Sequence, residues 1–538
     1  MKQQTASSTA IRAYAIIGST ASEAVLYDNA TARALAELLP LTVTLSDYDD
    51  VEKCCCLPYD LPHDTTHMGH SPRPGDIVFY PPCGCLSVFY RDDGYASDLI
   101  CLGRITGSLA PIHASGSVML TLVMATDACR SSDNVSTDND ITTSNDNLMI
   151  DSNRNFRMYV PTNIMFGPGE LNRLHEQKLP GRKALIVISN GRATKTNGYL
   201  ARVENELNMA GCDYAIFDKT EPNPLKDTVM AGGADARMQG CDFIVALGGG
   251  SVMDAAKAIA VMATNDGDYW EYVQRTRPVT NKPLPVVAIT TTAGTGSEAD
   301  PFAVISHPEL NQKVGFCTAD MFPVLSVVDP ELMLTVPPML TAFQGFDALF
   351  HSIECYISRK ANLISDMYAL TAIEYAAAAL PVAVTDGTNT DARTRMALAN
   401  TLSGVVMTLS SCTSEHSLEH AMSAYHQALP HGAGLIMISR AYFTHFVNSH
   451  VCDDRFIRMA QAMGMKEASS AADFITALTR LQEACGVDGL RMSDYGITTD
   501  EFAVLARNAY DTMGALFDAD RSTLSIDDCI AIYRASYR

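Results

Sequence analysis

The sequence predicts a multidomain protein: a small β-barrel domain, an α/β domain with a parallel sheet, and an all-helical domain. Three observations support this. Residues 127–155 are mostly Asp, Asn, Ser and Thr, a composition that cannot bury enough apolar surface to offset its chain entropy. Apolar strands alternate with helical stretches from 156 to 335, and strand patterns then give way to helical ones. The expected domains are therefore 10–126, 156–335 and 336–538, with 127–155 as a flexible linker.

The first domain is expected to be mostly β. "DIVFYPP", "LSVFYR" and "DLICLGRITG" are short β-rich stretches interrupted by Gly, Pro and Asp. One helix is predicted at "NATARALAELLP", with Asn29 as its N-cap and Pro40 as its stop. A small barrel with one helix fits this pattern.

The second domain is expected to hold a doubly wound sheet. "KALIVIS", "DYAIFD", "DFIVALGGG", "PVVAITTT" and "VLSVVDP" are apolar stretches of the kind that a parallel sheet buries on both faces. The third domain is rich in Ala, Leu and Met, as in "SDMYALTAIEYAAAAL", and is expected to be a helical bundle.

Composition limits the function classes. The 538 residues carry a net charge of −22 and no strongly basic stretch, so nucleic acid and anionic membranes are not expected partners. No uninterrupted apolar run of eighteen residues is present, and the first residues do not resemble a signal peptide. The 15 cysteines are dispersed. We therefore expect a cytoplasmic protein with free thiols.

Two glycine-containing loops follow apolar strands. In "DFIVALGGGSVMDAAKAIA", Gly249 and Gly250 let the backbone approach an anion, and Ser251 is expected to cap the following helix, whose dipole favours phosphate. The loop is neither a Walker A motif nor the G-x-G-x-x-G fingerprint, and a simple tight turn is the alternative. In "AITTTAGTGSEAD", hydroxyls of Thr291, Thr292, Thr295 and Ser297 are placed to reach phosphate or ribose oxygens. Two such loops at the carboxyl ends of strands of one sheet favour a dinucleotide site.

A polar cluster is expected in the helical domain. Asp347 and His351 share a helical face in "GFDALFHSIECY", with apolar residues around them. Residues 416–432, "HSLEHAMSAYHQALPHG", hold four of the 13 histidines. Asp347 and His351 with two of these histidines would form a site of one carboxylate and three imidazoles, suited to iron, zinc, nickel or cobalt. His426 lies on another face and is expected to point to solvent, and a polar helix interface is the alternative to a metal site.

These motifs resemble the iron-containing (group III) alcohol dehydrogenases. "GGGSVMDAAKAIA", "TTAGTGSEAD", "GFDALFHSIECYIS" and "HSLEHAMSAYHQALPHGAGL" occur in the family's order, from about residue 155 to the end of the chain. The resemblance implies a Rossmann-like domain that binds NAD or NADP and an α-helical domain that holds a divalent metal, iron(II) first and zinc second. It assigns the metal ligands to Asp347, His351, His416 and His431. It places His420 near the nicotinamide as a non-ligand that helps to relay the proton.

The same resemblance implies the cofactor contacts. They are Asn190, Asn223, Gly249, Gly250, Ser251, Asp254, Thr291, Thr292, Thr295 and Lys313. Many members that prefer NAD have Asp where this chain has Asn190, and Asn does not repel a 2′-phosphate, so NADP remains an expected cofactor. The implied activity is hydride transfer between a small alcohol, or its aldehyde or ketone, and NAD(P). Relatives commonly form dimers or larger assemblies, so a homo-oligomer is expected.

The front domain resembles the small bacterial cyclophilin-like domains. "LYDNATARALAELLPLTVTLSDY", "RPGDIVFYPPCGCLSVFYR" and "LGRITG" carry that resemblance, which implies a binding or regulatory module. The cysteines of "EKCCCLPY" and "PPCGC" do not have zinc-finger spacing and are expected to be free thiols. Two other functions remain open. One is a non-redox, NAD-using cyclase or lyase of the same fold, similar to dehydroquinate synthase. The other is a binding protein that uses the dehydrogenase part as a scaffold.

Overall fold

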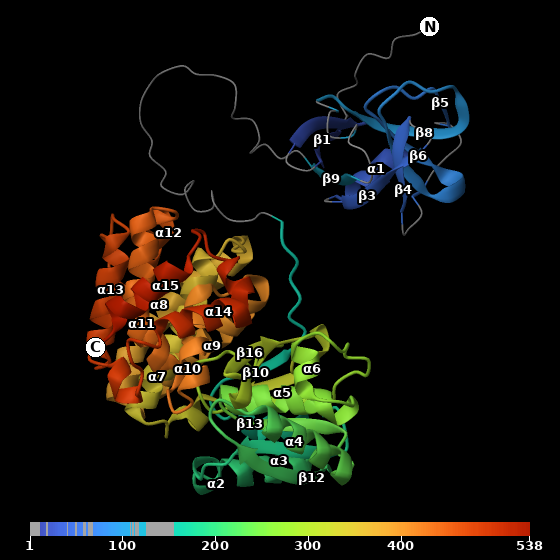
Figure 1. Ribbon diagram of the computed structural model, residues 1–538. Helices are drawn as coiled ribbons and strands as arrows, with labels where there is room; N and C mark the ends of the chain where they lie inside the picture. The colour runs from blue at the N-terminus through green and yellow to red at the C-terminus, as the bar shows by residue number, and fades with distance from the viewer. Residues whose placement is uncertain are drawn as a thin grey trace. The chain divides into compact units, whose positions relative to one another are not determined.

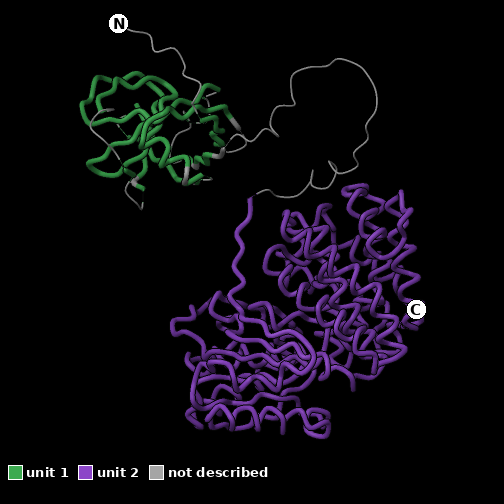
Figure 2. Tube along the Cα trace, turned by 180° about the vertical axis from the view of Figure 1, so that it is seen from behind, with its two compact units in different colours: residues 1–143 green, residues 144–538 purple. Residues whose placement is uncertain are grey.

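The computed structural model describes residues 11–17, 20–39, 41–48, 51–57, 61–62, 68–107, 109, 112, 118–124 and 155–538. The chain divides into two compact units, 1–143 and 144–538 (Figures 1 and 2). The expected linker at 127–155 lies outside the described residues apart from Asn155, and so does Pro40.

The first unit is a closed β-barrel. Its strands are β1 (Ile11–Ile17), β2 (Thr20–Leu26), β3 (Leu41–Tyr48), β4 (Glu52–Cys56), β5 (Met68–His70), β6 (Asp76–Tyr80), β7 (Cys85–Phe89), β8 (Ala96–Ile105) and β9 (Val118–Met124). Within the described residues they form one sheet in the order β2-β1-β9-β3-β4-β7-β6-β8-β5, and an additional β2–β8 pairing closes it. Its apolar core includes Leu26, Leu45, Ile77 and Leu86. The expected barrel is confirmed.

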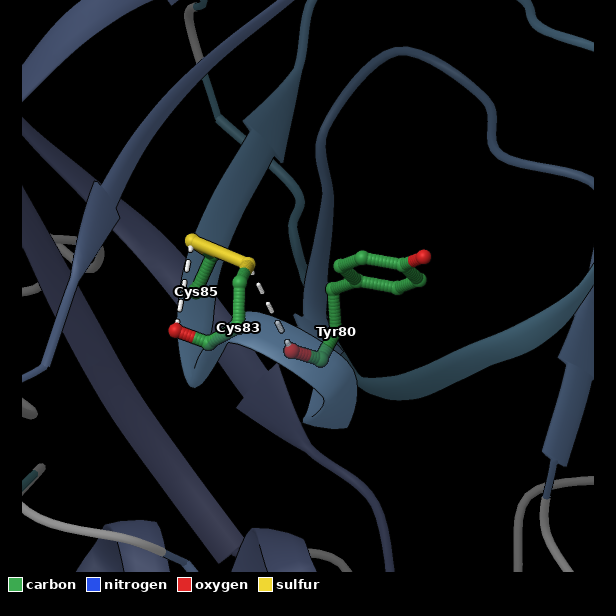
Figure 3. The surroundings of a disulfide bond; sticks show 3 residues. All are labelled: Tyr80, Cys83 and Cys85. Carbon is green, nitrogen blue, oxygen red and sulfur yellow. Dashed lines mark hydrogen bonds between the residues drawn. A yellow bond between two sulfur atoms is a disulfide. The ribbon is translucent and has the colours of Figure 1, made fainter.

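One helix, α1 (Ala30–Glu37), accompanies the barrel. Asn29 is its N-cap, as predicted, because the Asn29 side chain accepts a hydrogen bond from the backbone N–H of Ala32. The free-thiol expectation was wrong for two cysteines of this unit. Cys83 and Cys85, in the turn between β6 and β7, are joined by a disulfide (Figure 3).

The second unit begins with an α/β part. Its strands are β10 (Asn163–Phe166), β11 (Lys183–Ser189), β12 (Asp213–Thr220), β13 (Phe243–Gly248), β14 (Val286–Thr290), β15 (Ala303–His307), β16 (Gln312–Phe316) and β17 (Leu325–Val328). Six of them form a parallel sheet in the order β10-β17-β14-β13-β11-β12. The strands β15 and β16 form a separate antiparallel hairpin, which the sequence did not predict.

Helices cover both faces of the parallel sheet. They are α2 (Ala193–Thr196), α3 (Tyr199–Met209), α4 (Lys226–Gln239), α5 (Gly250–Thr264) and α6 (Tyr269–Val273). One apolar core joins the sheet to α4, α5 and α6, and another joins the sheet to α3. Because β13 and β14 are parallel and pair in register, with Gly248 opposite Thr290, the two glycine-containing loops leave the same edge of the sheet.

The rest of the unit is helical, as expected. The helices are α7 (Pro338–Ile357), α8 (Leu363–Thr385), α9 (Thr390–Leu409), α10 (Ser414–Tyr425), α11 (His431–Ser449), α12 (Asp453–Ala462), α13 (Ala472–Ala484), α14 (Phe502–Phe517) and α15 (Ile526–Ser536). They share one large apolar core (Figure 1). Among the described residues, one helix has the length and composition of a membrane span. It is α8, and 39% of its most apolar window is buried inside the protein.

Candidate active site

The two glycine-containing loops pack directly against each other. A Cβ atom on Gly249 would lie 2.7 Å from Thr292 Oγ1, and one on Gly250 would lie 2.2 Å from Thr295 Cγ2. The backbone N–H of Thr291 also donates to the carbonyl oxygen of Gly248 at 3.0 Å. Glycine is therefore required here by loop–loop contact. The structure brings these five predicted cofactor residues together at one edge of the sheet.

Ser251 does not cap α5 as predicted. The helix begins at Gly250, one residue before Ser251. Its N-cap is Gly249, which offers no side-chain hydrogen bond. Ser251 lies in the first turn and is partly exposed. The first backbone N–H groups of α5 consequently have no capping side chain, which suits an anion-binding helix terminus.

Asp254 lies beneath the second loop. Its Oδ1 accepts from Ser297 Oγ at 2.7 Å and its Oδ2 accepts from the backbone N–H of Val304 at 2.9 Å. Lys257 Nζ donates to Ser297 Oγ at 2.8 Å and to Asp300 Oδ1 at 3.0 Å. Burial raises the pKa of Asp254 despite the opposing charge of Lys257. Both carboxylate oxygens of Asp254 are used inside the protein, so its geometry favours holding the loop in shape.

The three remaining predicted cofactor residues lie in different surroundings. Asn190 is exposed just after β11, on the side of the sheet where the loops emerge. Asn223 has a left-handed backbone (φ 53°), and its Nδ2 donates to the carbonyl oxygen of Gln427 at 3.2 Å, just before α11. Lys313, on β16, is buried against the helical part. Asn223 and Lys313 therefore connect the α/β part to the helices.

Four predicted ligand residues converge between α7, α10 and α11. Asp347 Oδ1 lies 3.7 Å from His351 Nδ1, 3.6 Å from His416 Nε2 and 3.4 Å from His431 Nε2. The imidazole rings of His351 and His416 stack with centroids 4.4 Å apart. Three separate helices thus direct one carboxylate and three imidazoles at a common point.

The site has the chemistry of a cation site. Asp347 Oδ1 and His416 Nε2 are buried and make no hydrogen bond, which is costly unless an ion satisfies them. The potential ligand atoms of Asp347, His416 and His431 lie within 4.8 Å of one another. Burial lowers the pKa of His351 to about 3 despite the charge of Asp347, so this imidazole is neutral and able to bind a metal. The donor set fits a divalent transition metal.

Two buried glutamates support the histidines, and the sequence prediction missed both. Glu354 contacts His416 Nδ1 and also accepts from the backbone N–H of Thr413 at 2.9 Å. Glu419 contacts His431 Nδ1, and Lys313 Nζ lies 3.3 Å from its Oε2. A carboxylate on the distal ring nitrogen fixes the orientation of a ligating histidine. The available signal was the presence of Glu in otherwise apolar helical stretches.

A thiol was also missed. Cys412, just before α10, has its sulfur within 4.8 Å of ring nitrogens of His351 and His416. A hydrogen bond with Cys355, together with burial, raises the pKa of the Cys412 thiol well above its usual range. It is therefore a neutral thiol next to the histidines, and a weaker metal ligand than a thiolate.

The other two histidines of the cluster differ in position. His420 lies next to the convergence point, with its ring centroid 5.3 Å from that of His431 and its Nδ1 2.9 Å from Met513 Sδ. Burial holds the pKa of His420 well below its usual range, so the ring is neutral. His426 does not point to solvent as predicted. Its side chain is only 16% exposed, and its Nε2 lies 3.0 Å from Glu501 Oε1.

The second loop connects the two parts of the site. The carbonyl oxygen of Gly294 lies 3.3 Å from His351 Nδ1, and a Cβ atom on Gly294 would lie 3.2 Å from Asp347 Oδ2. Residues 291–295 therefore contact the first glycine loop through Thr292 and Thr295 and the carboxylate–imidazole cluster through Gly294.

Comparison with known proteins identifies the family to which residues 161–537 belong. A family model described as iron-containing alcohol dehydrogenase matches residues 161–330, and one described as the C-terminal part of that family matches residues 341–537. The 1,3-propanediol dehydrogenase of Klebsiella pneumoniae is 34% identical over 366 residues, covering 66% of this chain and 93% of that protein. The chain belongs to the iron-containing alcohol dehydrogenase family. Its residues 15–123 match a model described as the cyclophilin-like family.

Other relatives agree with this family. The NAD-dependent methanol dehydrogenase of Bacillus methanolicus is 32% identical, covering 66% of this iron-type alcohol dehydrogenase and 93% of the relative. The crystal structure of the archaeal halo-thermophilic Red Sea brine pool alcohol dehydrogenase ADH/D1 matches with a TM-score of 0.68 and 33% identity. The match covers 71% of this chain and 99% of that one. The crystal structure of a 1,3-propanediol oxidoreductase matches with a TM-score of 0.66 and 32% identity, and the match covers 71% of this chain and 100% of that one. The expected iron-type, NAD(P)-dependent alcohol dehydrogenase with a cyclophilin-like module is confirmed.

Proposed function

We propose that this alcohol dehydrogenase transfers hydride between a short-chain primary alcohol or diol and NAD at the cluster formed by Asp347, His351, His416 and His431. The observation that carries the proposal is the convergence of three imidazole nitrogens on Asp347 Oδ1, which is buried and makes no hydrogen bond. Two relatives are named as dehydrogenases of 1,3-propanediol and methanol, which supports a small alcohol as the substrate.

The four side chains would hold a divalent metal, iron(II) first and zinc second. When bound, such a metal polarises the alcohol oxygen and favours its ionised form. Asp347 would supply one negative charge, and imidazoles that ligate a metal are neutral, so the four side chains with a divalent metal would carry a net positive charge.

The glycine-containing loops would hold the cofactor. In this proposal the backbone of Gly249 and Gly250, with Ser251, binds the diphosphate at the start of α5, and the hydroxyls of Thr291, Thr292 and Thr295 complete the contacts. Asn190 would face the adenosine ribose. Asp254, Asn223 and Lys313 are assigned supporting positions because their polar groups bond within the protein. Because Gly294 contacts His351, a cofactor held by these loops would have its nicotinamide end beside the cluster.

His420 is proposed to move the hydroxyl proton. Its ring is neutral and buried beside His431, so Nε2 can accept a proton from the alcohol side through water. Its Nδ1 faces Met513, a weak acceptor. Met513 is therefore the hydrogen-bond partner of the His420 ring among the described residues.

The test is a screen of primary alcohols, diols and their aldehydes with NAD and NADP. The protein is first freed of metal and then loaded with iron(II) or zinc, and absorbance of the reduced nicotinamide is followed. Turnover of short primary alcohols with NAD on the iron-loaded protein is expected. Full activity of the metal-free protein, or no redox change with any alcohol or aldehyde, would contradict the proposal.

The remaining assignments are part of the same proposal. We assign cofactor binding to residues 156–335 and metal binding to residues 336–538. We further propose a cytoplasmic homo-oligomer whose partners include neither nucleic acid nor membrane. Support comes from the net charge of −22 and from α8, whose Ala369, Ile373 and Leu380 lie in the core of the helical part.

A further inference from the structure

The turn between β6 and β7 carries a pair of cysteines that the dehydrogenase chemistry does not use. Cys83 ends a short 3-10 turn (Pro81–Cys83), Gly84 follows with a left-handed backbone, and Cys85 opens β7. The disulfide between them spans a sequence separation of 2, with Cα atoms 5.4 Å apart (Figure 3). Cys83 is exposed and Cys85 is partly exposed.

A structural role does not explain this disulfide. A disulfide stabilises a fold chiefly by restricting the unfolded chain, and the effect grows with the length of the closed loop. Here the loop contains one residue, Gly84, and the turn is already held by the β6–β7 pairing, in which Tyr80 faces Cys85. Exposed disulfides that stabilise little are the ones that take part in redox exchange.

The neighbouring strand brings further cysteines to the same place. β4 pairs with β7 and carries Cys54, Cys55 and Cys56 in succession, and the register sets Cys56 opposite Cys85. Residues opposite each other in an antiparallel pair have Cα atoms about 4.5–5.5 Å apart, and disulfides span about 4.4–6.8 Å. The backbone therefore allows a Cys56–Cys85 disulfide in place of the Cys83–Cys85 one.

The surroundings also accommodate the reduced pair. Cys83 Sγ lies 3.9 Å from the carbonyl oxygen of Tyr80, and Cys85 Sγ lies 3.7 Å from that of Cys83 (Figure 3). These carbonyls can accept weak hydrogen bonds from two thiols once the disulfide is open. Burial raises the pKa of Cys101, Cys485 and Cys529 to about 12, which keeps these three thiols protonated and unreactive.

We propose that Cys83, Cys85 and Cys56 form a thiol–disulfide exchange site that reacts with dithiols. The Cys56 thiolate attacks Cys85 Sγ, so that a Cys56–Cys85 bond forms and Cys83 leaves as an exposed thiolate. A dithiol reduces either disulfide in two steps. Its first thiolate forms a mixed disulfide and releases one cysteine thiolate. Its second thiol then closes the dithiol to a disulfide and releases the other cysteine, so two electrons and two protons pass to the protein.

The experiment uses the full chain and dithiothreitol as the dithiol probe. The protein is equilibrated at a series of ratios of oxidised to reduced dithiothreitol and quenched with acid. Free thiols are then alkylated, and the peptides are measured by mass spectrometry. Cys83 and Cys85 are expected to gain and lose label together at one midpoint, whereas the labelling of the buried free Cys452 should stay constant across the series. In Cys83→Ser, oxidation is expected to yield a Cys56–Cys85 cross-link.

Cys55→Ser is the matched control, because Cys55 lies on the same strand but pairs with Leu86. It should exchange like the wild type. Dehydrogenase activity should be unchanged in Cys83→Ser, so a failure of this proposal is separate from a failure of the catalytic one. Labelling of Cys83 and Cys85 as independent thiols at every ratio would overturn the proposal. So would the absence of a Cys56–Cys85 cross-link in oxidised Cys83→Ser.

Discussion

Asp347 Oδ1 and His431 Nε2 lie 3.4 Å apart, although the two residues belong to α7 and α11. The helices that carry them share one apolar core, and Pro430 at the start of α11 fixes where His431 enters the site. The geometry of the proposed metal site therefore depends on the packing of the whole helical part.

His431→Ala is expected to remove metal and activity together. The change deletes one of the four proposed ligands. Loss of a side chain that only supports a ligand costs roughly 10–100-fold in metal affinity, so loss of a ligand itself should cost at least as much. The metal content of the purified variant and its rate of nicotinamide reduction are the two measurements. A variant that keeps both would contradict the ligand assignment.

His426→Ala is the matched control for that variant. His426 lies five residues before His431, but its Nε2 faces Glu501, away from the cluster. We expect unchanged metal content and activity. A slightly lower thermal midpoint is expected from the lost His426–Glu501 contact, which is worth about 0–1 kcal/mol for a partly exposed pair.

Glu354→Gln and Glu419→Gln are each expected to weaken metal binding without abolishing it. Each carboxylate holds the distal nitrogen of a proposed ligand histidine, and loss of such a partner typically costs about 10–100-fold in metal affinity. Competition with a chelator of known affinity measures the change in the dissociation constant directly.

Glu415→Gln is the control for the two glutamates. Glu415 lies on α10 with Glu419 and is fully buried, but its carboxyl oxygens make no hydrogen bond. Burial raises the pKa of Glu415 well above its usual range, so the wild-type group is neutral like glutamine. Metal affinity should match the wild type. An equal loss in all three variants would mean that Glu354 and Glu419 act only through general packing.

Much of the site was predictable because it rests on local patterns. The i, i+4 spacing of Asp347 and His351, and the apolar strands before each glycine loop, are periodic features that sequence alone displays. The supporting contacts were not predictable, because Glu354 reaches His416 and Lys313 reaches Glu419 across long stretches of chain. The misplaced cap at Ser251 has a local cause: Gly249 already has the extended backbone that an N-cap needs.

His420→Gln is expected to keep the metal and lose turnover. A proton relay contributes about 10²–10⁴-fold, and the loss should appear in kcat while the metal content stays at the wild-type level. The deficit should shrink as pH rises, because hydroxide takes over the removal of the proton. A pH-independent deficit would instead indicate that His420 only shapes the pocket.

Asn190→Asp is expected to increase the preference for NAD over NADP. A carboxylate after β11 accepts hydrogen bonds from the ribose hydroxyls and repels a 2′-phosphate. The kcat/KM for NADP should fall by about tenfold or more, equivalent to roughly 1.4 kcal/mol, with NAD as the internal reference. Equal changes in kcat/KM with both cofactors would mean that residue 190 does not contact the ribose.

Asp520→Asn is expected to change how stability depends on pH. Asp520 is 1% exposed, and its Oδ1 accepts from the backbone N–H of Ser414 at 3.1 Å and from Tyr442 at 3.2 Å. Burial raises the pKa of Asp520 to about 7, whereas an unfolded chain has an Asp pKa of about 3.9. The folded state therefore holds more protons between pH 4 and 7, and this group lowers stability as pH rises through that window.

The asparagine side chain cannot ionise, so the variant should lose this destabilisation. Relative to wild type, its free energy of unfolding should increase by up to about 1.4 kcal/mol per pH unit from pH 4 to 7 and then level off. Urea midpoints at pH 5, 6, 7 and 8, followed by circular dichroism, measure the difference. Asp518→Asn, at the exposed end of α14, is the control and should run parallel to wild type. If the stability of Asp520→Asn also changed with pH as the wild type does, Asp520 would be ionised throughout this range. Its charge would then be stabilised by the hydrogen bonds from Ser414 and Tyr442.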